Sequence, residues 1–256
     1  MSCTERLPLA RVLAATCFIW TWFLVIPNSG HAAPTLAWSE LGEEDGVHIY
    51  RRAEPGTGLF EFRGVGVVNA SMAKIVALLS DASKMPRWLE GCISGELVEK
   101  NYDEKANYTD MKGKNVVFYA VNKAPWPLHN RDYVIASSLA STAATSLKPA
   151  GLVIDIHSIS HPKFPPKKGL IRLPLMRSRI GLSPMDNAND KTEVDFSVVM
   201  DPGGILPAFI VNMVSHDLPL KTLLALNELV MDQEYNHDLE RMIQRIYAQP
   251  KSQPAH

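Results

Sequence analysis

The segment Asp201-Pro202-Gly203-Gly204-Ile205-Leu206-Pro207 constrains the fold more than any other part of the chain. It separates a strand-like segment, whose alternation of apolar and polar residues ends at Met200, from a long apolar helical pattern. Two glycines after a proline supply the backbone freedom of a sharp reversal, and Pro207 suits a first helical turn, where its missing N–H costs little. A tight turn is therefore expected to join a strand to a long helix here.

The helix after this turn carries a wide apolar stripe. Its apolar residues recur at steps of three and four: Leu206, Phe209, Ile210, Met213, Val214, Leu220, Leu223, Leu224, Val230 and Met231. Pro219 interrupts the pattern and predicts a kink, because it cannot donate a hydrogen bond to the carbonyl of Ser215. The kink either wraps the helix around a sheet or serves as a hinge.

The segments before this helix predict an α+β order. Helices are expected at 39–44, after Ser71 as the capping residue, and as a short turn after Pro86. The expected strands are Val47–Arg52, Leu59–Val68, Gly95–Asn101, Ala106–Met111, Asn115–Val121, Arg131–Ser141, Leu152–Ser158, Leu170–Leu175 and Thr192–Met200. Helices do not alternate with these strands, so the pattern favours an antiparallel sheet.

The amino terminus has the pattern of an export signal. Arg6 and Arg11 precede an apolar run from Val12 to Ile26, and Gly30-His31-Ala32 offers small residues for cleavage after Ala32. The run is shorter than the ~20 residues of a typical spanning helix, although an uncleaved membrane anchor is the alternative. The expected organisation is a signal peptide 1–32, a short linker 33–37, one domain 38–248 and a disordered tail 249–256. Such a protein is expected to be periplasmic or secreted.

A second motif, Pro125-Trp126-Pro127-Leu128-His129-Asn130-Arg131-Asp132-Tyr133, opens one of the expected strands. Together with the segment 201–207, it resembles START domains, a lipid-transfer family. The resemblance extends from Trp38 to Tyr247. It implies a helix-grip fold, in which a curved antiparallel sheet of about nine strands wraps around a long C-terminal helix and encloses a hydrophobic tunnel.

Several expected strands are apolar on both faces, as in Val116 and Phe118 against Val117 and Tyr119. Either a solid sandwich core or a ligand tunnel accounts for this pattern, and the resemblance favours the tunnel. The expected ligand-facing set comprises Val116, Phe118, Tyr133, Ile135, Ser137, Ile154, Ile156, Leu173, Leu175, Phe209, Met213 and Leu220. Asp155 and His157 are expected on the opposite face.

The resemblance also carries implications for the ligand's polar end. Phe118 and Ser137 fall where cholesterol-binding members of the family hold a buried acid and arginine, so an ion pair is absent and Ser137 is the one expected hydrogen-bonding group. Carriers of phosphatidylcholine surround the choline with aromatic rings, for which Tyr108, Tyr119 and Trp126 are the candidates.

The resemblance implies that the loop 123–130 covers the tunnel mouth, and its prolines predict that this lid is preshaped, because they restrict the unfolded chain. Trp126 and the kink at Pro219 form the expected gate. Arg131 and Asp132 are expected to tie the loop to neighbouring backbone through charged hydrogen bonds rather than to contact the ligand.

Composition and motifs favour a binding protein over an enzyme. A net charge of −1 gives no general attraction to nucleic acid, and the chain has no metal-ligand or nucleotide motif, so no cofactor or metal is implied. Cys92 is expected to be a half-buried thiol rather than a nucleophile. The expected function is non-enzymatic transfer of a hydrophobic ligand by a monomer in transient contact with membranes. The alternatives are a tunnel enzyme that uses His48, His129 or Asp155, and a lipid sensor that does not transfer its ligand.

Overall fold

The computed structural model describes residues 37–101, 115–145, 149–185 and 190–248. The chain divides into two units, Met1–Thr35 and Leu36–His256, and the description below concerns the second unit. The expected signal peptide, the expected strand Ala106–Met111 and the expected tail 249–256 lie outside the described residues. The domain organisation expected from the sequence stays a prediction.

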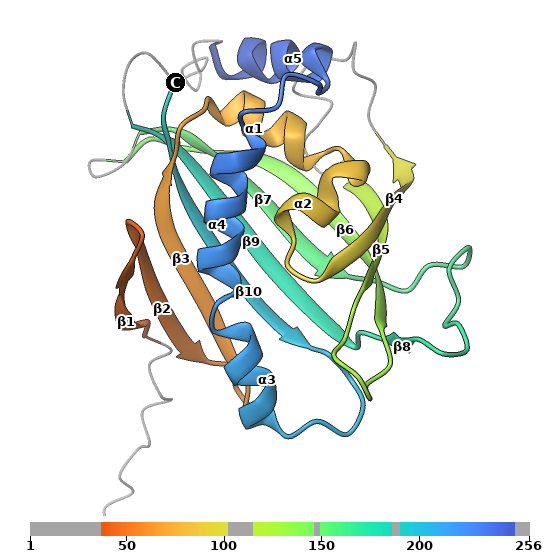
Figure 1. Cartoon of the computed structure of the whole chain (residues 1–256). Coiled ribbons are helices and arrows are strands. Elements are labelled where there is room, and N and C mark those ends of the chain that lie inside the picture. Colours follow the sequence, from red (N-terminus) through yellow and green to blue (C-terminus); the bar gives the residue numbers. More distant parts are fainter. Residues whose placement is uncertain (1–36, 102–114, 146–148, 186–189, 249–256) are drawn as a thin grey trace, which may run out of the picture. The chain divides into compact units, whose positions relative to one another are not determined.

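In the described part of the chain, the strands form one ten-stranded sheet in the order β1-β2-β3-β10-β9-β7-β6-β5-β4, with β8 off this path beside β6 (Figure 1). The bounds are β1 Ser39–Glu44, β2 Val47–Ala53, β3 Phe60–Val68, β4 Cys92–Lys100, β5 Asn115–Asn122, β6 Arg131–Thr142, β7 Gly151–Ser158, β8 Ile171–Arg172, β9 Leu175–Pro184 and β10 Thr192–Asp201. Neighbours along this path pair antiparallel, while β6 and β8 pair parallel. The antiparallel helix-grip architecture expected from the sequence is confirmed.

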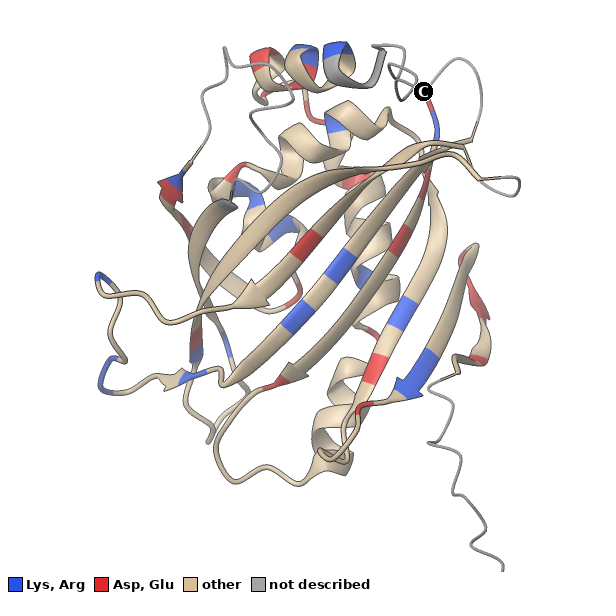
Figure 2. Cartoon of the chain, turned by 180° about the vertical axis from the view of Figure 1, so that it is seen from behind, with Lys and Arg blue, Asp and Glu red and all other residues tan. Residues whose placement is uncertain are grey.

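The helices lie on one face of this sheet, as the views from the front and from behind both show (Figures 1 and 2). Their bounds are α1 Met72–Leu79, η1 Ala82–Lys84, α2 Met85–Trp88, α3 Ala208–Ser215, α4 Leu218–Leu229 and α5 His237–Ala248. Ser71 caps α1 as expected, because its side chain accepts a hydrogen bond from the N–H of Lys74 at 3.1 Å.

The single kinked helix expected after residue 207 is two helices, α3 and α4. Pro219 lies in the first turn of α4, where its missing N–H is tolerated, and α3 ends before it at Ser215. The turn before α3 follows the expectation, since Gly203 and Gly204 adopt φ values of 67° and 78° that favour glycine.

Two glycines of β3 allow α4 to lie close to the sheet. A Cβ at Gly64 would come within 2.8 Å of the Pro219 Cβ, and a Cβ at Gly66 within 2.8 Å of the Leu223 Cδ2. Either side chain would push α4 away from the strand. The start of α4 is therefore packed tightly on β3.

The residues 39–44, expected as a helix, form strand β1 instead. Asp45 and Gly46 both have positive φ, 50° and 74°, as the two central residues of a primed hairpin turn require. This Asp-Gly pair joins β1 to β2 as an antiparallel hairpin. The turn chemistry decides the conformation here, and the helical reading was wrong.

Strand β9 and helix α5 are absent from the sequence-based expectation. The expected strand Leu170–Leu175 is reduced to β8, and the ten-residue β9 begins only at Leu175. In β9, Met176, Ser178 and Ile180 are buried, whereas Arg177 and Arg179 are exposed. This alternation is the strand signal that the expectation missed.

The outer face of the sheet carries charged side chains, and blue and red bands on the ribbon in Figure 2 mark where charged residues lie along the strands. Arg63 donates two hydrogen bonds to Asp195, each at 2.6 Å, and Arg179 lies 2.8 Å from Asp155. Asp155 and His157 point to this face, as expected. The inner face is therefore left to apolar residues.

The outer apolar residues of β5 and β6 have a cover of their own. Val117, Tyr119 and Val134 form a small cluster with Phe164, whose ring stacks on Tyr119 with 4.5 Å between centroids. Both faces of these strands are apolar because the inner face meets the helices and the outer face meets the segment between β7 and β8.

Candidate ligand-binding site

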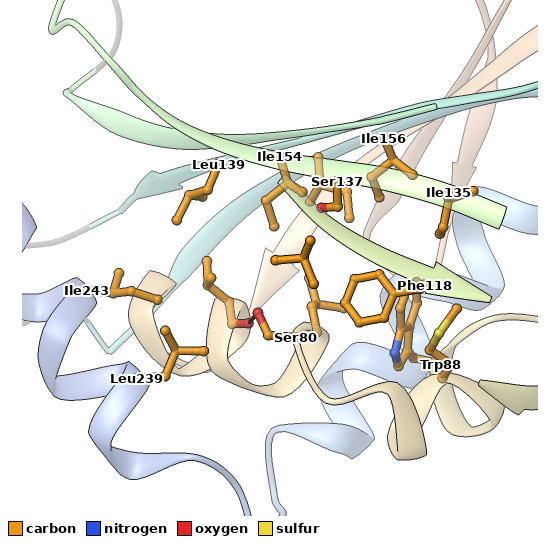
Figure 3. A pocket seen from close by; sticks show the side chains of 15 residues that line it. Ser80, Trp88, Phe118, Ile135, Ser137, Leu139, Ile154, Ile156, Leu239 and Ile243 are labelled. Carbon is orange, nitrogen blue, oxygen red and sulfur yellow. Dashed lines mark hydrogen bonds between the residues drawn. The ribbon is translucent and has the colours of Figure 1, made fainter. Parts of the chain in front are cut away.

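The first cavity, called here the inner cavity, lies between the sheet and the helices α1, α2 and α5 (Figure 3). Its volume is about 60 Å³. It is lined by Val76, Leu79, Ser80, Met85, Trp88, Val116, Phe118, Ile135, Ser137, Leu139, Ile154, Ile156, Ile180, Leu239 and Ile243. No charged side chain is among them.

The register of the strands determines which residues of the sheet line the inner cavity. Val116 pairs with Ser137, and Ser137 with Ile156, so alternate residues of β5, β6 and β7 project to the same face. Helix α5 contributes Leu239 and Ile243 at one side of the cavity, and Trp88 lies at the other side beside Phe118 (Figure 3). The inner cavity thus extends from α5 to α2.

A second cavity, called here the polar-end cavity, begins where the inner cavity meets α2. Its volume is about 30 Å³, and it shares Trp88, Ile135 and Ile156 with the inner cavity. Its other lining residues are Leu89, Glu90, Asn122, Tyr133, Met176, Ser178, Phe196, Val198, Met200, Leu218 and Thr222. Asn122 ends β5 and Leu218 begins α4, so this cavity lies towards the loop 123–130 and α3.

At the α5 end, an outer hollow of about 250 Å³ adjoins the inner cavity. Ser80, Val116 and Leu239 line both spaces. Leu97, which is 45% exposed, also lines the hollow, so this space opens to solvent. These three shared residues lie between the inner cavity and the outer hollow.

The structure brings seven of the twelve expected ligand-facing residues to these two cavities. They are Val116, Phe118, Ile135, Ser137, Ile154 and Ile156 in the inner cavity and Tyr133 in the polar-end cavity. Tyr133 donates a hydrogen bond to the Asn122 Oδ1 at 2.9 Å, and burial raises the pKa of its hydroxyl well above the usual value.

The other five expected residues do not line either cavity. Leu173 and Leu220 are buried in the core. Leu175 points to the outer face of β9, because its neighbour Met176 points inward and lines the polar-end cavity. Phe209 and Met213 of α3 are 69% and 65% exposed. The division between α3 and α4 explains this, since α3 packs on the sheet through Val211 and Ser215 instead.

The two expected gate residues lie in different environments. Trp126 is 92% exposed, whereas Pro219 is buried against Gly64. The loop 123–130 is nevertheless tied to the turn 201–207, because Arg131 donates from Nε to the Pro202 carbonyl at 3.3 Å and from Nη1 to the His129 carbonyl. The two motifs of the sequence therefore meet, as expected for a structural role of Arg131.

Asp132 bonds to side chains rather than to the expected backbone groups. It is fully buried and accepts two hydrogen bonds from Arg172, at 3.1 and 2.9 Å, and one from the Tyr119 hydroxyl at 3.2 Å. These contacts hold Tyr119 on the outer face. Tyr119 and the exposed Trp126 do not form an aromatic cage in the described cavities, and Tyr108 lies outside the described residues.

Sequence reasoning missed the helical half of the inner wall. Val76 and Leu79 come from α1, Met85 and Trp88 from α2, and Leu239 and Ile243 from α5. The spacings of three and four within these pairs are typical of a helix face. The expectation assigned this face to the helix after residue 207, which lines only the polar-end cavity.

The alternative enzymatic residues do not meet at the cavities. His48 lies 3.3 Å from Glu40 on the β1–β2 hairpin, His129 is exposed in its loop, and Asp155 is on the outer face. Burial raises the pKa of the Cys92 thiol, which disfavours the reactive thiolate. Among the described residues, no group of three histidine, cysteine or acidic side chains suits a metal ion, and no helix has the length and hydropathy to cross a bilayer.

Comparison with known proteins identifies a family and several relatives of this chain. The START domain model matches residues 33–229, so α5 lies beyond it. An uncharacterized protein of Pseudomonas aeruginosa is 30% identical over 73% of this chain and 83% of its own length. The phosphatidylcholine transfer protein of Rattus norvegicus is 28% identical over 68% of this chain and 75% of its own length.

Solved structures give the same result. A STAR-related lipid transfer protein fragment from Xanthomonas axonopodis aligns with a TM-score of 0.62 at 26% identity, covering 76% of this chain and 99% of the fragment. Human STARD10 aligns with a TM-score of 0.60 at 21% identity, covering 77% of this chain and 74% of that chain, and it supports the fold alone. The family match over most of the chain and these relatives show that this protein belongs to the START domain family.

Proposed function

We propose that this protein binds one hydrophobic molecule, a phospholipid, fatty acyl lipid or sterol-like compound, between its sheet and helices and transfers it between membranes without a covalent step. The observation that carries the proposal is the inner cavity, whose wall is apolar apart from Ser80, Ser137 and the indole N–H of Trp88. Burial of hydrocarbon contributes ~25 cal/mol per Å² removed from water, so such a wall favours an apolar chain. Relatives named as lipid transfer proteins support the same function.

Binding requires the cavities to expand. Ligand pockets commonly have volumes of roughly 300–1,000 Å³, whereas the inner and polar-end cavities measure about 60 and 30 Å³. A close-packed wall does not stretch continuously, so helices have to move away from the sheet. The described structure is thus a closed form, and the ligand enters through an open one.

Helix α3 and the segment before it offer a membrane-contact surface. Ile205, Phe209, Met213 and Val214 are 103%, 69%, 65% and 63% exposed, and Trp126 is 92% exposed. Figure 1 shows α3 and the loop between β5 and β6 at the same end of the sheet. Large exposed apolar side chains are typical of surfaces that contact a partner or a membrane. We therefore assign this set, called the α3 surface, to transient membrane contact.

The export signal expected in residues 1–32 supports the proposal that this carrier works outside the cytoplasm, free or tethered. N-terminal sequencing of protein recovered from the exported fraction tests this point. A mature protein that begins at Ala33 supports a free carrier. Intact Met1 in the membrane fraction would restrict the protein to work while tethered.

A vesicle-to-vesicle transfer assay tests the proposed function. Donor vesicles contain a fluorescent lipid that is quenched by its own concentration, and acceptor vesicles do not. The account predicts that purified protein accelerates the rise in fluorescence in proportion to its concentration, with one lipid bound per protein. Bound lipid without acceleration would favour the sensor alternative, and conversion of the lipid to a product would favour an enzyme. If the protein neither binds lipid nor accelerates its transfer, the proposal is contradicted.

A further inference from the structure

Three buried residues that line the polar-end cavity each carry a polar side-chain atom without a hydrogen-bond partner. These atoms are the Trp88 Nε1, the Ser178 Oγ and the Thr222 Oγ1. The three residues are 7%, 3% and 1% exposed. A buried polar group that lacks a partner costs free energy, so native proteins rarely retain one without a reason. Three such atoms around one cavity indicate that the cavity holds a polar group in the working protein.

The three residues come from separate elements, α2, β9 and α4, and converge only in the folded chain. Other polar side chains around this cavity already have partners. Tyr133 donates to Asn122, and Glu90 lies 3.4 Å from the ammonium of Lys221. The unused hydrogen-bonding capacity of the cavity is therefore concentrated on Trp88, Ser178 and Thr222.

Size and charge restrict what these atoms can bind. In the closed form this cavity has a volume of about 30 Å³, which accommodates a group the size of a water molecule. The indole N–H only donates, while the two hydroxyls donate and accept. No arginine or lysine is among the described lining residues, and the nearby Lys221 ammonium is exposed and paired with Glu90, so a buried phosphate would have no buried cation to compensate it. An uncharged hydroxyl satisfies both conditions, because it accepts from Trp88 and exchanges hydrogen bonds with Ser178 and Thr222.

We propose that Trp88, Ser178 and Thr222 bind the free hydroxyl at the polar end of an uncharged lipid. Its hydrocarbon lies in the inner cavity, which continues from Trp88, Ile135 and Ile156 towards α5. This inference rests on the proposed function and names the class of cargo: neutral lipids with a hydroxyl head, in preference to phospholipids with the same chains.

Two lipids with identical chains test the proposal. The purified protein is equilibrated with vesicles that contain equal amounts of dioleoylglycerol and dioleoylphosphatidylcholine, and the lipid that co-purifies with it is quantified by mass spectrometry. The diacylglycerol is expected to exceed the phosphatidylcholine at least tenfold. Each of Ser178→Ala, Thr222→Val and Trp88→Phe is expected to lower that ratio about fivefold to tenfold.

The matched control is Ser197→Ala in β10. Ser197 is also buried, at 7% exposure, but pairs in register with Arg63 and Arg179 and shares their outer face. Its variant is expected to keep the wild-type ratio. Because Ser178→Ala and Thr222→Val remove unpartnered hydroxyls, they are also expected not to lower the melting temperature of the lipid-free protein.

The outcomes separate the two proposals. If the protein binds neither lipid, the proposed function fails and this inference fails with it. If it binds both lipids equally and the variants leave the ratio unchanged, lipid binding stands and the hydroxyl site is overturned. If the variants lower the melting temperature without changing the ratio, the three residues hold a structural water and the inference is again overturned.

Discussion

Helices α5 and α3 lie at opposite ends of the space between sheet and helices (Figure 1). The apolar side chains of α5 are buried, whereas several of those of α3 are exposed. In α5, Leu239, Met242 and Ile243 are 3%, 3% and 1% exposed. In α3, Phe209 and Met213 are 69% and 65% exposed. The α5 end is therefore a wall of the cavity, while the α3 end presents an apolar surface to solvent.

The tethers of the two helices differ as well. The segment before α5 is held by Asp232, which accepts a hydrogen bond from Lys84 at 2.6 Å, and by Tyr235, which donates to Glu240 at 2.7 Å. Burial and the Glu240 carboxylate raise the pKa of Tyr235 to about 12, so its hydroxyl stays a donor at physiological pH. Helix α3 is held through Asn212, which accepts from the Phe60 N–H at 2.9 Å and donates to the Gly58 carbonyl at 3.1 Å, and through the buried Val211. This contrast suits an orientation with the hydrocarbon end at α5 and the polar end near α3.

A charge placed between the two ends is expected to have the largest effect. Phe118→Glu puts an unpaired carboxylate into the inner cavity, which costs several kcal/mol and excludes hydrocarbon. Ser137→Arg is expected to act in the same way. Lipid uptake, measured by mass spectrometry of extracted protein, should fall below detection in both variants.

The control for Phe118→Glu is Val117→Glu, because Val117 is 5% exposed and Phe118 is 6% exposed, yet they face opposite sides of β5. Val117→Glu is expected to lose stability but to retain lipid in the fraction that folds. Equal uptake by the two variants would mean that the inner face of the sheet does not contact the ligand.

Shortening a side chain at the α5 end is expected to change which hydrocarbon chains fit. Ile243→Ala enlarges the inner cavity, lowers the free energy of unfolding by about 2–5 kcal/mol and shifts the bound lipids towards longer chains. The chain lengths of extracted lipids measure this shift. Met242→Ala is the control, since Met242 is equally buried but does not line the cavity. A shift in both variants, or in neither, would contradict the assignment of α5 as the end wall.

Polar substitutions on the α3 surface are expected to slow transfer without affecting the fold. Full burial of a Phe or Met side chain contributes roughly 1.5–3 kcal/mol, so partial insertion of two such residues into a membrane supports about a tenfold effect. The double variant Phe209→Ser, Met213→Ser is expected to transfer lipid about ten times more slowly, with stability changed by no more than ~0.5 kcal/mol. Met231→Ser, at a residue that is 75% exposed at the end of α4, is the control. Equal rates in both variants would place the membrane contact elsewhere.

The smallest expected effect concerns the tether of α5. Hydrogen bonds from Lys84 and Arg87 lower the pKa of the Asp232 carboxyl, so its folded-state pKa lies below its unfolded value. The tether therefore stabilises the fold above the usual carboxyl pKa of about 3.9 and is lost as the pH falls through the lower folded value. Asp232→Asn should lower the melting temperature slightly at pH 7, and this difference should shrink as the pH falls below about 3.9. A difference that stays constant over that range would show that the charge is not the cause.

Much of the sheet could be predicted because its strands carry strong local signals. Alternating and β-branched residues mark β5, β6, β7 and β10, and two proline-rich motifs mark the turns that Arg131 joins to Pro202. The face of β5 and β6 that points inward followed from the resemblance to START domains, which placed Phe118 and Ser137 in the tunnel. The prediction failed where the decisive signal is not an apolar pattern. At 39–44 that signal is the Asp45-Gly46 turn, and in β9 it is the alternation of charged and buried residues.

The helical side of the site was harder to predict, because periodicity shows that a helix has an apolar side but not what covers it. Phe209 and Leu223 belong to one continuous stripe in the sequence, yet Phe209 is 69% exposed and Leu223 is 1% exposed. The break before Pro219 separates their orientations. Trp88, Ser178 and Thr222 carry no sequence signal in common, because only the fold brings them to one cavity.

Photo-crosslinking with two labelled lipids tests the orientation of the cargo most directly. One diacylglycerol carries a diazirine at the end of an acyl chain, and the other carries it near the glycerol hydroxyl. Peptide mass spectrometry then locates the attachment sites in the purified protein. The account predicts that the chain-end label reaches α5, α1 or the residues around Leu139, and that the label near the hydroxyl reaches α2, β9 or the start of α4. Labels at reversed ends, or attachment only to the outer face of the sheet, would contradict it.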